Sequence, residues 1–247
     1  MPVDIQRIEM NQLACWRVRR GEDELLIAEQ GAQILSYRQG DAPPIIWLSE
    51  EAAFEQGQSV RGGVPVCWPW FGDLARNPQE VQASYHGEQP APFHGLVRAL
   101  PWQLREQRGE GDTAILEFHC PQALGALPGW PHRVELTLQI RLADELELSL
   151  SSRNVGTEAV TISQALHSYF AVSDIHGIAV THYHRDHIGL VPALLKANPE
   201  MWLAIHGEDL RAVKRFASRA VGSPSRPERP SGSAWRPASS SRQAATR

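Results

Sequence analysis

The sequence predicts a mainly β protein with antiparallel strands, followed by a small α/β segment and a disordered tail. Apolar and polar residues alternate along much of residues 13–172. After Ile188 the apolar spacing changes to that of helices mixed with a strand. From Gly222 onward Ser, Pro, Arg, Gly and Ala predominate. Alternation with period two is typical of half-buried strands, and a polar, Pro-rich segment cannot bury enough apolar surface to fold.

The strands are expected in chain order, with short turns between them. The segment from His132 to Leu142 alternates, with an apolar residue at every second position from Val134, and Leu146, Leu148 and Leu150 repeat this pattern after a turn at Ala143-Asp144. One apolar and one solvated face, joined by short turns, predict an antiparallel meander. The other strand candidates are Leu13–Val18, Glu24–Glu29, Gln33–Arg38, Trp102–Glu106, Ala114–His119 and the segment that carries Val160 and Ile162.

Two Pro- and Gly-rich segments, Gly62–Asp73 and Asn77–Gly95, interrupt the strands and are too long for hairpin turns. Disordered segments are poor in aromatic residues. The aromatic side chains in both segments therefore favour ordered loops packed over a cleft, and disorder is the alternative.

The composition and charge of the chain argue against nucleic-acid binding. The chain has 247 residues, 42% apolar and 21% charged, with a net charge of −4. The tail from Gly222 carries five Arg and one Glu, which leaves the rest of the chain at −8. So acidic a body argues against a nucleic-acid surface, because phosphate binding needs clustered Lys and Arg.

The cysteines and the hydropathy pattern predict a soluble cytoplasmic protein. Cys15, Cys67 and Cys120 are odd in number and lack CxxC spacing, so neither a disulfide framework nor a thiolate zinc site is expected. The first residues contain no apolar core of a signal peptide. No apolar run approaches the roughly 20 residues that cross a bilayer, so no membrane association is expected.

Arginine and histidine residues on the irregular segments predict a binding site for a small anion. Arg61 precedes two glycines, Arg98 follows His94-Gly95, and His167 ends a short strand candidate. Guanidinium groups bind phosphate through paired, charge-assisted hydrogen bonds. The alternative is that both arginines form surface salt bridges.

The aromatic residues of the first long loop have two possible roles. Trp68, Trp70 and Phe71 could form a flat wall against a sugar ring, or the tryptophans could belong to the core.

Three segments of the chain resemble a known family. They are Ser59-Val-Arg-Gly-Gly-Val-Pro-Val-Cys-Trp-Pro-Trp-Phe-Gly72, Phe93-His-Gly-Leu-Val-Arg98 and Ala165-Leu-His-Ser-Tyr-Phe170. In order and spacing they resemble the glucose-6-phosphate 1-epimerases (hexose-6-phosphate mutarotases) of the aldose 1-epimerase group. The resemblance implies a galactose-mutarotase-like antiparallel β-sandwich over residues 1–175, C-terminally truncated because its later strands have no counterpart.

The same resemblance implies an isomerase that interconverts the α and β anomers of a hexose 6-phosphate without a cofactor. It assigns His167 as the general acid for the ring oxygen, and Arg61 and Arg98 as ligands of the phosphate or sugar hydroxyls, with His94 lining the site. The family's general base is a glutamate well downstream, for which this chain has no match, so we expect impaired activity. A strand-end His167 without a chemical role is the competing interpretation.

A second motif follows near residue 178. Within Ile178–Gly189, His182, His184, Asp186 and His187 resemble the HxHxDH metal loop of the metallo-β-lactamase fold. Two metals in such a loop would generate a hydroxide nucleophile. The later ligands of that fold are not found, so we expect no working metal site.

The predicted organisation is therefore an incomplete epimerase-like sandwich at 1–175, a metallo-β-lactamase-like α/β fragment at 176–221 and a disordered tail at 222–247. The expected partner is a small-molecule sugar phosphate, and the sequence does not fix the oligomeric state. The alternative functions are a metal-dependent hydrolase that uses the HxHxDH loop, and an inactive chimeric gene product.

Overall fold

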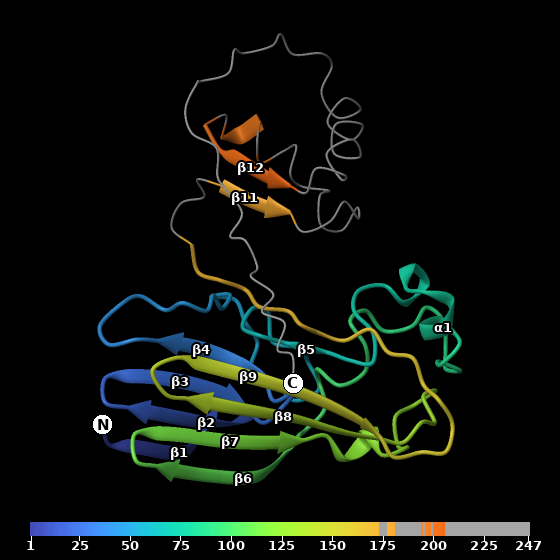
Figure 1. The fold of residues 1–247 in the computed structure, drawn as a ribbon, viewed down its shortest axis with the longest axis horizontal. Helices are drawn as coiled ribbons and strands as arrows, with labels where there is room; N and C mark the ends of the chain where they lie inside the picture. Colours follow the sequence, from blue (N-terminus) through green and yellow to red (C-terminus); the bar gives the residue numbers. More distant parts are fainter. Residues whose placement is uncertain (173–176, 181–193, 195, 199, 206–247) are drawn as a thin grey trace, which may run out of the picture. The chain divides into compact units, whose positions relative to one another are not determined.

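The structure is a computed structural model that describes residues 1–172, 177–180, 194, 196–198 and 200–205 (Figure 1). The chain divides into two compact units, Met1–Ser173 and Asp174–Arg247.

Two four-stranded antiparallel sheets form the body of the first unit (Figure 1). Each sheet is a meander, in which strands consecutive in sequence pair with one another. The first sheet contains β1 (Val3–Met10), β2 (Leu13–Arg20), β3 (Asp23–Ala28) and β4 (Ile34–Arg38). The second contains β6 (Gln103–Glu110), β7 (Thr113–His119), β8 (Val134–Leu142) and β9 (Leu146–Asn154).

Five short elements of the first unit lie outside the two sheets, in the segments between β4 and β6, between β7 and β8, and after β9. These are β5 (Val66–Cys67), η1 (Leu74–Arg76), α1 (Gln79–Gln82), η2 (Pro121–Ala123) and β10 (Ala165–Leu166). The antiparallel pair of β5 and β10 joins two segments that are far apart in the sequence.

The main core lies between the two sheets. It combines side chains of the first sheet, such as Val18 and Leu25, with side chains of the second, such as Phe118 and Leu138. Every second residue of β8 is buried, from Val134 to Leu142. Burial of a large apolar side chain contributes about 1.5–3 kcal/mol, so the alternating face of β8 is a principal source of stability. The sandwich geometry follows from this shared apolar layer.

A second, smaller core covers the opposite face of the first sheet. Leu13, Cys15, Ala28 and Leu35 pack there with Val60. Val60 lies in the loop that leads to Arg61, so this small core holds the start of that loop against the sheet.

Arg20 is a buried cation that links the first sheet to two hairpin turns of the second. Its side chain is 5% exposed. Its Nε donates to the Asp112 carbonyl oxygen (2.7 Å), and its Nη2 donates to the carboxylates of Asp112 (2.9 Å) and Asp144 (2.6 Å). The hydrogen bond and charge of Arg20 hold the pKa of Asp112 below its ordinary value. The contact thus fixes the ends of the two sheets against each other.

The structure confirms a mainly β, antiparallel fold and most of the predicted strands. β8 and β9 follow the alternating segment, with the predicted turn between them. The strand expected around Val160 and Ile162 is wrong, because residues 155–164 form no strand. Both residues still pack against the core, which accounts for their apolar character. The edge strand β1 was not predicted, since none of its residues is fully buried.

In the second unit, β11 (Gly177–Val180) and β12 (Trp202–Ile205) form a parallel pair. β12 lies in the segment after Ile188 for which the sequence predicts a strand among helices. Parallel pairing is typical of α/β structure. In the part of the chain that the structure describes, no helix is long and apolar enough to cross a membrane.

Candidate active site

Pairing of β5 with β10 brings the predicted histidine His167 to the first long loop. The pairing sets Ala165 opposite Cys67, and His167 follows β10 directly. The His167 amide donates to the carbonyl oxygen of Pro65 (3.0 Å), and the Tyr169 amide to that of Gly63 (3.0 Å). The backbone on both sides of His167 is therefore fixed, and its imidazole projects from a defined position.

A second histidine, His94, is held by a reciprocal pair of hydrogen bonds with Gly72. The His94 amide donates to the Gly72 carbonyl oxygen (2.8 Å), and the Gly72 amide donates to His94 Nδ1 (3.1 Å). A ring nitrogen that accepts a backbone N–H carries no proton, so this contact assigns the His94 proton to Nε2. His94 thus presents a hydrogen-bond donor on the free edge of its ring.

The two histidines lie next to each other among aromatic rings. The His94 and His167 ring centroids are 5.3 Å apart, with planes at 87°. Phe71 contacts both rings, at 5.0 Å from His94 and 5.5 Å from His167. Tyr169 stacks on His167 at 4.6 Å and 14°, and Phe93 meets His94 edge-on at 4.4 Å. These contacts fix the orientation of both imidazoles.

Both imidazoles favour the neutral form. Desolvation by burial, with the positive charge of Arg98 and the neighbouring His167, lowers the pKa of His94 to about 4. Desolvation and the Arg98 charge also lower the pKa of His167. Among the described residues, no Asp or Glu side chain forms a hydrogen bond or ion pair with either ring. The site is thus a neutral histidine pair beside a fixed positive charge.

The lowered pKa of His94 predicts a loss of stability in mild acid. The unfolded chain takes up a proton near the ordinary pKa of 6.5, whereas the folded chain resists it down to about 4. The contribution of His94 to the free energy of unfolding is therefore fully present above about pH 6.5 and is lost as the pH falls through 4. We expect urea midpoints measured from pH 7 to pH 4 to fall more steeply for the wild type than for His94→Gln. Equal slopes would contradict the prediction.

The two predicted arginines differ in their surroundings. Arg98 is half-buried, and its Nη2 donates to the Phe93 carbonyl oxygen at 2.7 Å. Its other N–H donors have no partner among the described residues, so they are available to a ligand near the histidines. Arg61 is exposed and, within the same residues, its guanidinium forms no hydrogen bond or ion pair. The predicted alternative, surface salt bridges for both arginines, is therefore wrong for the described part of the chain.

The structure brings Arg98, His94 and His167 together, whereas within the described ranges no hydrogen bond or ion pair joins the Arg61 side chain to any of them. The Arg61 carbonyl oxygen accepts the Ser49 amide (3.1 Å), which ties this residue to the outer part of the loop.

Of the three aromatic residues predicted to form a flat wall against a sugar ring, only Phe71 contacts the histidines among the described residues. Trp68 and Trp70 are 0% exposed and belong to the core, as the alternative held. Their indole nitrogens donate to Ser152 Oγ (3.0 Å) and to the Pro92 carbonyl oxygen (2.9 Å). Buried indoles normally find such partners.

Sequence reasoning missed two aromatic residues of the site, Tyr169 and Phe93. Both lie within two positions of a predicted site histidine. Neither residue belongs to a recognisable spacing pattern, but its position next to a predicted site histidine in the sequence is a signal that could have identified it.

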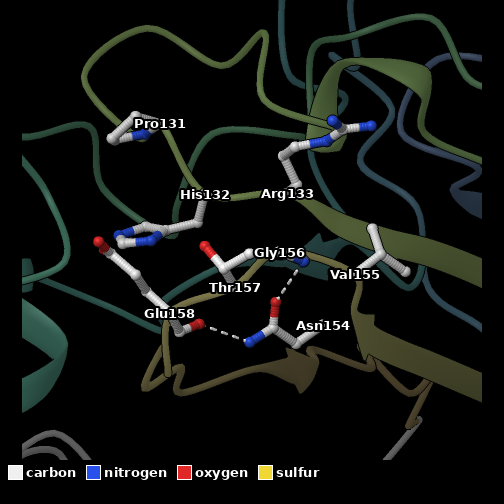
Figure 2. A pocket seen from close by; sticks show the side chains of 8 residues that line it. All are labelled: Pro131, His132, Arg133, Asn154, Val155, Gly156, Thr157 and Glu158. Atoms are coloured by element: carbon white, nitrogen blue, oxygen red, sulfur yellow. Dashed lines mark hydrogen bonds between the residues drawn. The ribbon is translucent and has the colours of Figure 1, made fainter.

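A surface pocket of about 350 Å³ lies elsewhere on the first unit (Figure 2). Its lining comes from the start of β8 and the turn after β9, and consists of Pro131, His132, Arg133, Asn154, Val155, Gly156, Thr157 and Glu158. The Asn154 side chain accepts the Gly156 amide (2.9 Å) and donates to the Glu158 carbonyl oxygen (2.8 Å), as the dashed lines in Figure 2 show. None of the predicted site residues lines this pocket, so it is separate from the histidine pair.

The four residues of the HxHxDH motif, His182, His184, Asp186 and His187, lie outside the described residues. Within the described ranges, no group of three or more His, Cys, Asp or Glu side chains is placed to hold a metal ion.

Comparison with known families gives two matches. The sequence model of the aldose 1-epimerase family matches residues 15–188. That of the metallo-beta-lactamase superfamily matches residues 156–240, about a third of the chain.

The chain is also similar to individual proteins and solved structures. An Escherichia coli (strain K12) protein named "Putative glucose-6-phosphate 1-epimerase" is 34% identical over 177 residues, which cover 72% of this chain and 55% of that protein. The crystal structure of YeaD from Salmonella typhimurium, described as a "putative mutarotase", is 31% identical with a TM-score of 0.57 and covers 71% of this chain and 56% of that one. A galactose mutarotase-like protein from Clostridium acetobutylicum, 18% identical, shares the fold with a TM-score of 0.52 and covers 68% and 54% of the two chains.

The chain thus spans little more than half the length of the relatives that it matches. The match to the aldose 1-epimerase family model, over residues 15–188, includes both histidines of the site and the loops that carry them.

Proposed function

Because the chain belongs to the aldose 1-epimerase family, we propose that it binds a hexose 6-phosphate and interconverts the α and β anomers by acid–base ring opening. The observation that carries the proposal is the pair of oriented imidazoles, His94 and His167, beside the N–H donors of Arg98 that have no partner among the described residues. A sugar phosphate requires this combination of anion ligand and proton donor.

In the proposed reaction, the anomeric hydroxyl loses its proton to a base while His167 delivers a proton to the ring oxygen. The bond between C1 and the ring oxygen breaks, and the open-chain aldehyde forms. Rotation about the C1–C2 bond exposes the other face of the carbonyl. The reverse proton transfers then close the ring and return both groups to their starting states.

Arg98 would couple phosphate binding to the acid role of His167. In the free protein, burial and the Arg98 charge lower the pKa of His167, so little imidazolium exists at neutral pH. A phosphate dianion at Arg98 offsets that charge, and the pKa of His167 rises. The substrate itself then favours the protonated acid.

His94 has a different part in this proposal. Its Nδ1 accepts the Gly72 amide, so its Nε2–H can donate to a sugar oxygen but cannot take a proton from one. His94 therefore binds and orients the sugar. With no carboxylate against either ring among the described residues, water is the available base. A missing catalytic group typically costs 10²–10⁴-fold in rate, so we expect slow turnover.

Polarimetry on freshly dissolved α-glucose 6-phosphate tests the proposal. We expect the protein to accelerate mutarotation over buffer, and to do so more for glucose 6-phosphate than for glucose, because only the former has the anion for Arg98. Calorimetric titration of glucose 6-phosphate provides the matching binding measurement. If the protein neither accelerates mutarotation nor binds glucose 6-phosphate, the proposal is wrong.

A further inference from the structure

Phe93 is a large apolar side chain that folding does not bury. Its residue is 58% exposed, whereas Trp68 and Trp70 in the same region are fully buried. The ring nevertheless has a defined place, because its centroid lies 4.4 Å from that of His94 with the planes at 82°.

The backbone around Phe93 is held at three successive residues. The Pro92 carbonyl oxygen accepts from the Trp70 indole (2.9 Å), the Phe93 carbonyl oxygen from Arg98 Nη2 (2.7 Å), and the His94 amide donates to Gly72 (2.8 Å). A single exposed apolar residue on a mobile loop needs no explanation. Here the loop is fixed, and it holds an aromatic face open to solvent beside the candidate reacting groups.

We propose that Phe93 recognises the closed pyranose ring of the sugar by packing against its C–H face. This inference rests on the proposed function and adds a specificity residue to it. The chair of glucopyranose presents axial hydrogens on C2 and C4 on one face that carries no axial hydroxyl in either anomer, which makes that face apolar. An open-chain alditol phosphate has the same phosphate and similar hydroxyls but no such face. Phe93 therefore distinguishes the closed sugar ring from the open-chain alditol, while Arg98 binds the phosphate that both ligands share.

The test compares glucose 6-phosphate with glucitol 6-phosphate by calorimetric titration. The wild type is expected to bind the ring form more tightly than the alditol. Phe93→Ala should weaken glucose 6-phosphate binding roughly five- to tenfold, which corresponds to about 50 Å² of apolar area left in water. Its binding of glucitol 6-phosphate should change by less than about twofold, and Phe93→Tyr should retain the preference of the wild type.

Leu124→Ala is the matched control, because Leu124 is also an exposed apolar residue (41%) but lies outside the site. It should leave both affinities unchanged. If Phe93→Ala weakens both ligands equally, or neither, the role assigned to Phe93 is wrong. If the wild type binds neither sugar phosphate, the proposed function fails as well, and that outcome is distinguishable from the failure of Phe93 alone.

Discussion

Replacing His167 by asparagine is expected to lower the protein-catalysed rate of mutarotation about 100-fold, because it removes the group that we propose protonates the ring oxygen. The substitution keeps a polar side chain at the end of β10, and the backbone contact of His167 with Pro65 remains available. Glucose 6-phosphate should therefore still bind through Arg98. Polarimetry measures the rate, and calorimetric titration measures the affinity.

His86→Asn is a suitable control for this experiment. His86 is exposed, and its backbone pairs with Gly129 away from the histidine pair, so the rate should not change. A His167→Asn protein with the rate of the wild type would show that the strand-end histidine has no chemical role. A variant that loses binding together with the rate would instead point to a ligand-holding role for His167.

The second large effect is expected from Gly95→Ala, which should lower the free energy of unfolding by at least about 3 kcal/mol. Gly95 has a φ of +80°, and a Cβ there would overlap the carbonyl oxygen of Trp68. That carbonyl accepts the Leu96 amide (2.7 Å), so the backbone cannot move aside without the loss of this bond. The displaced loop carries His94 and Arg98, so ligand binding should weaken as well.

Gly57→Ala separates the clash from the backbone strain. Gly57 has nearly the same φ, +78°, but no atom of the described part of the chain lies within 4 Å of the position of its Cβ. Only the cost of a left-handed conformation, about 1–2 kcal/mol, should remain. Urea denaturation of both variants gives the difference. Equal midpoints would mean that the contact of Gly95 with Trp68 does not constrain the fold.

Much of the fold could be predicted from local patterns. β8 is the clearest case, because the same alternation that the sequence shows from Val134 to Leu142 appears as alternating burial. Alternation reports which face of a segment is buried, but not whether a partner strand exists. This is why the sequence predicts a strand at Val160 and Ile162, which pack on the core without pairing to another strand.

The candidate site was harder to predict than the sheets. Motif spacing located His94, His167 and Arg98, but their proximity depends on the pairing of β5 with β10, which no local pattern specifies. The sequence also could not show which aromatic side chains of the loop point inward. Trp70 turned to the core, where its indole reaches a carbonyl oxygen, and Phe71 turned to the histidines.

The loop that carries Gly72 has a consequence for the order of folding. The hydrogen bond from the Gly72 amide to His94 joins residues 22 positions apart in the sequence. The hydrogen bond from the Phe71 amide to Ser163 Oγ joins residues 92 positions apart. Entropy makes distant contacts slower to form than local hairpins, so the meanders of both sheets can assemble before His167 reaches His94. The two sheets and the complete histidine pair are therefore expected to form at separate stages of folding. The proposed sugar-phosphate binding would be regained only at the later stage.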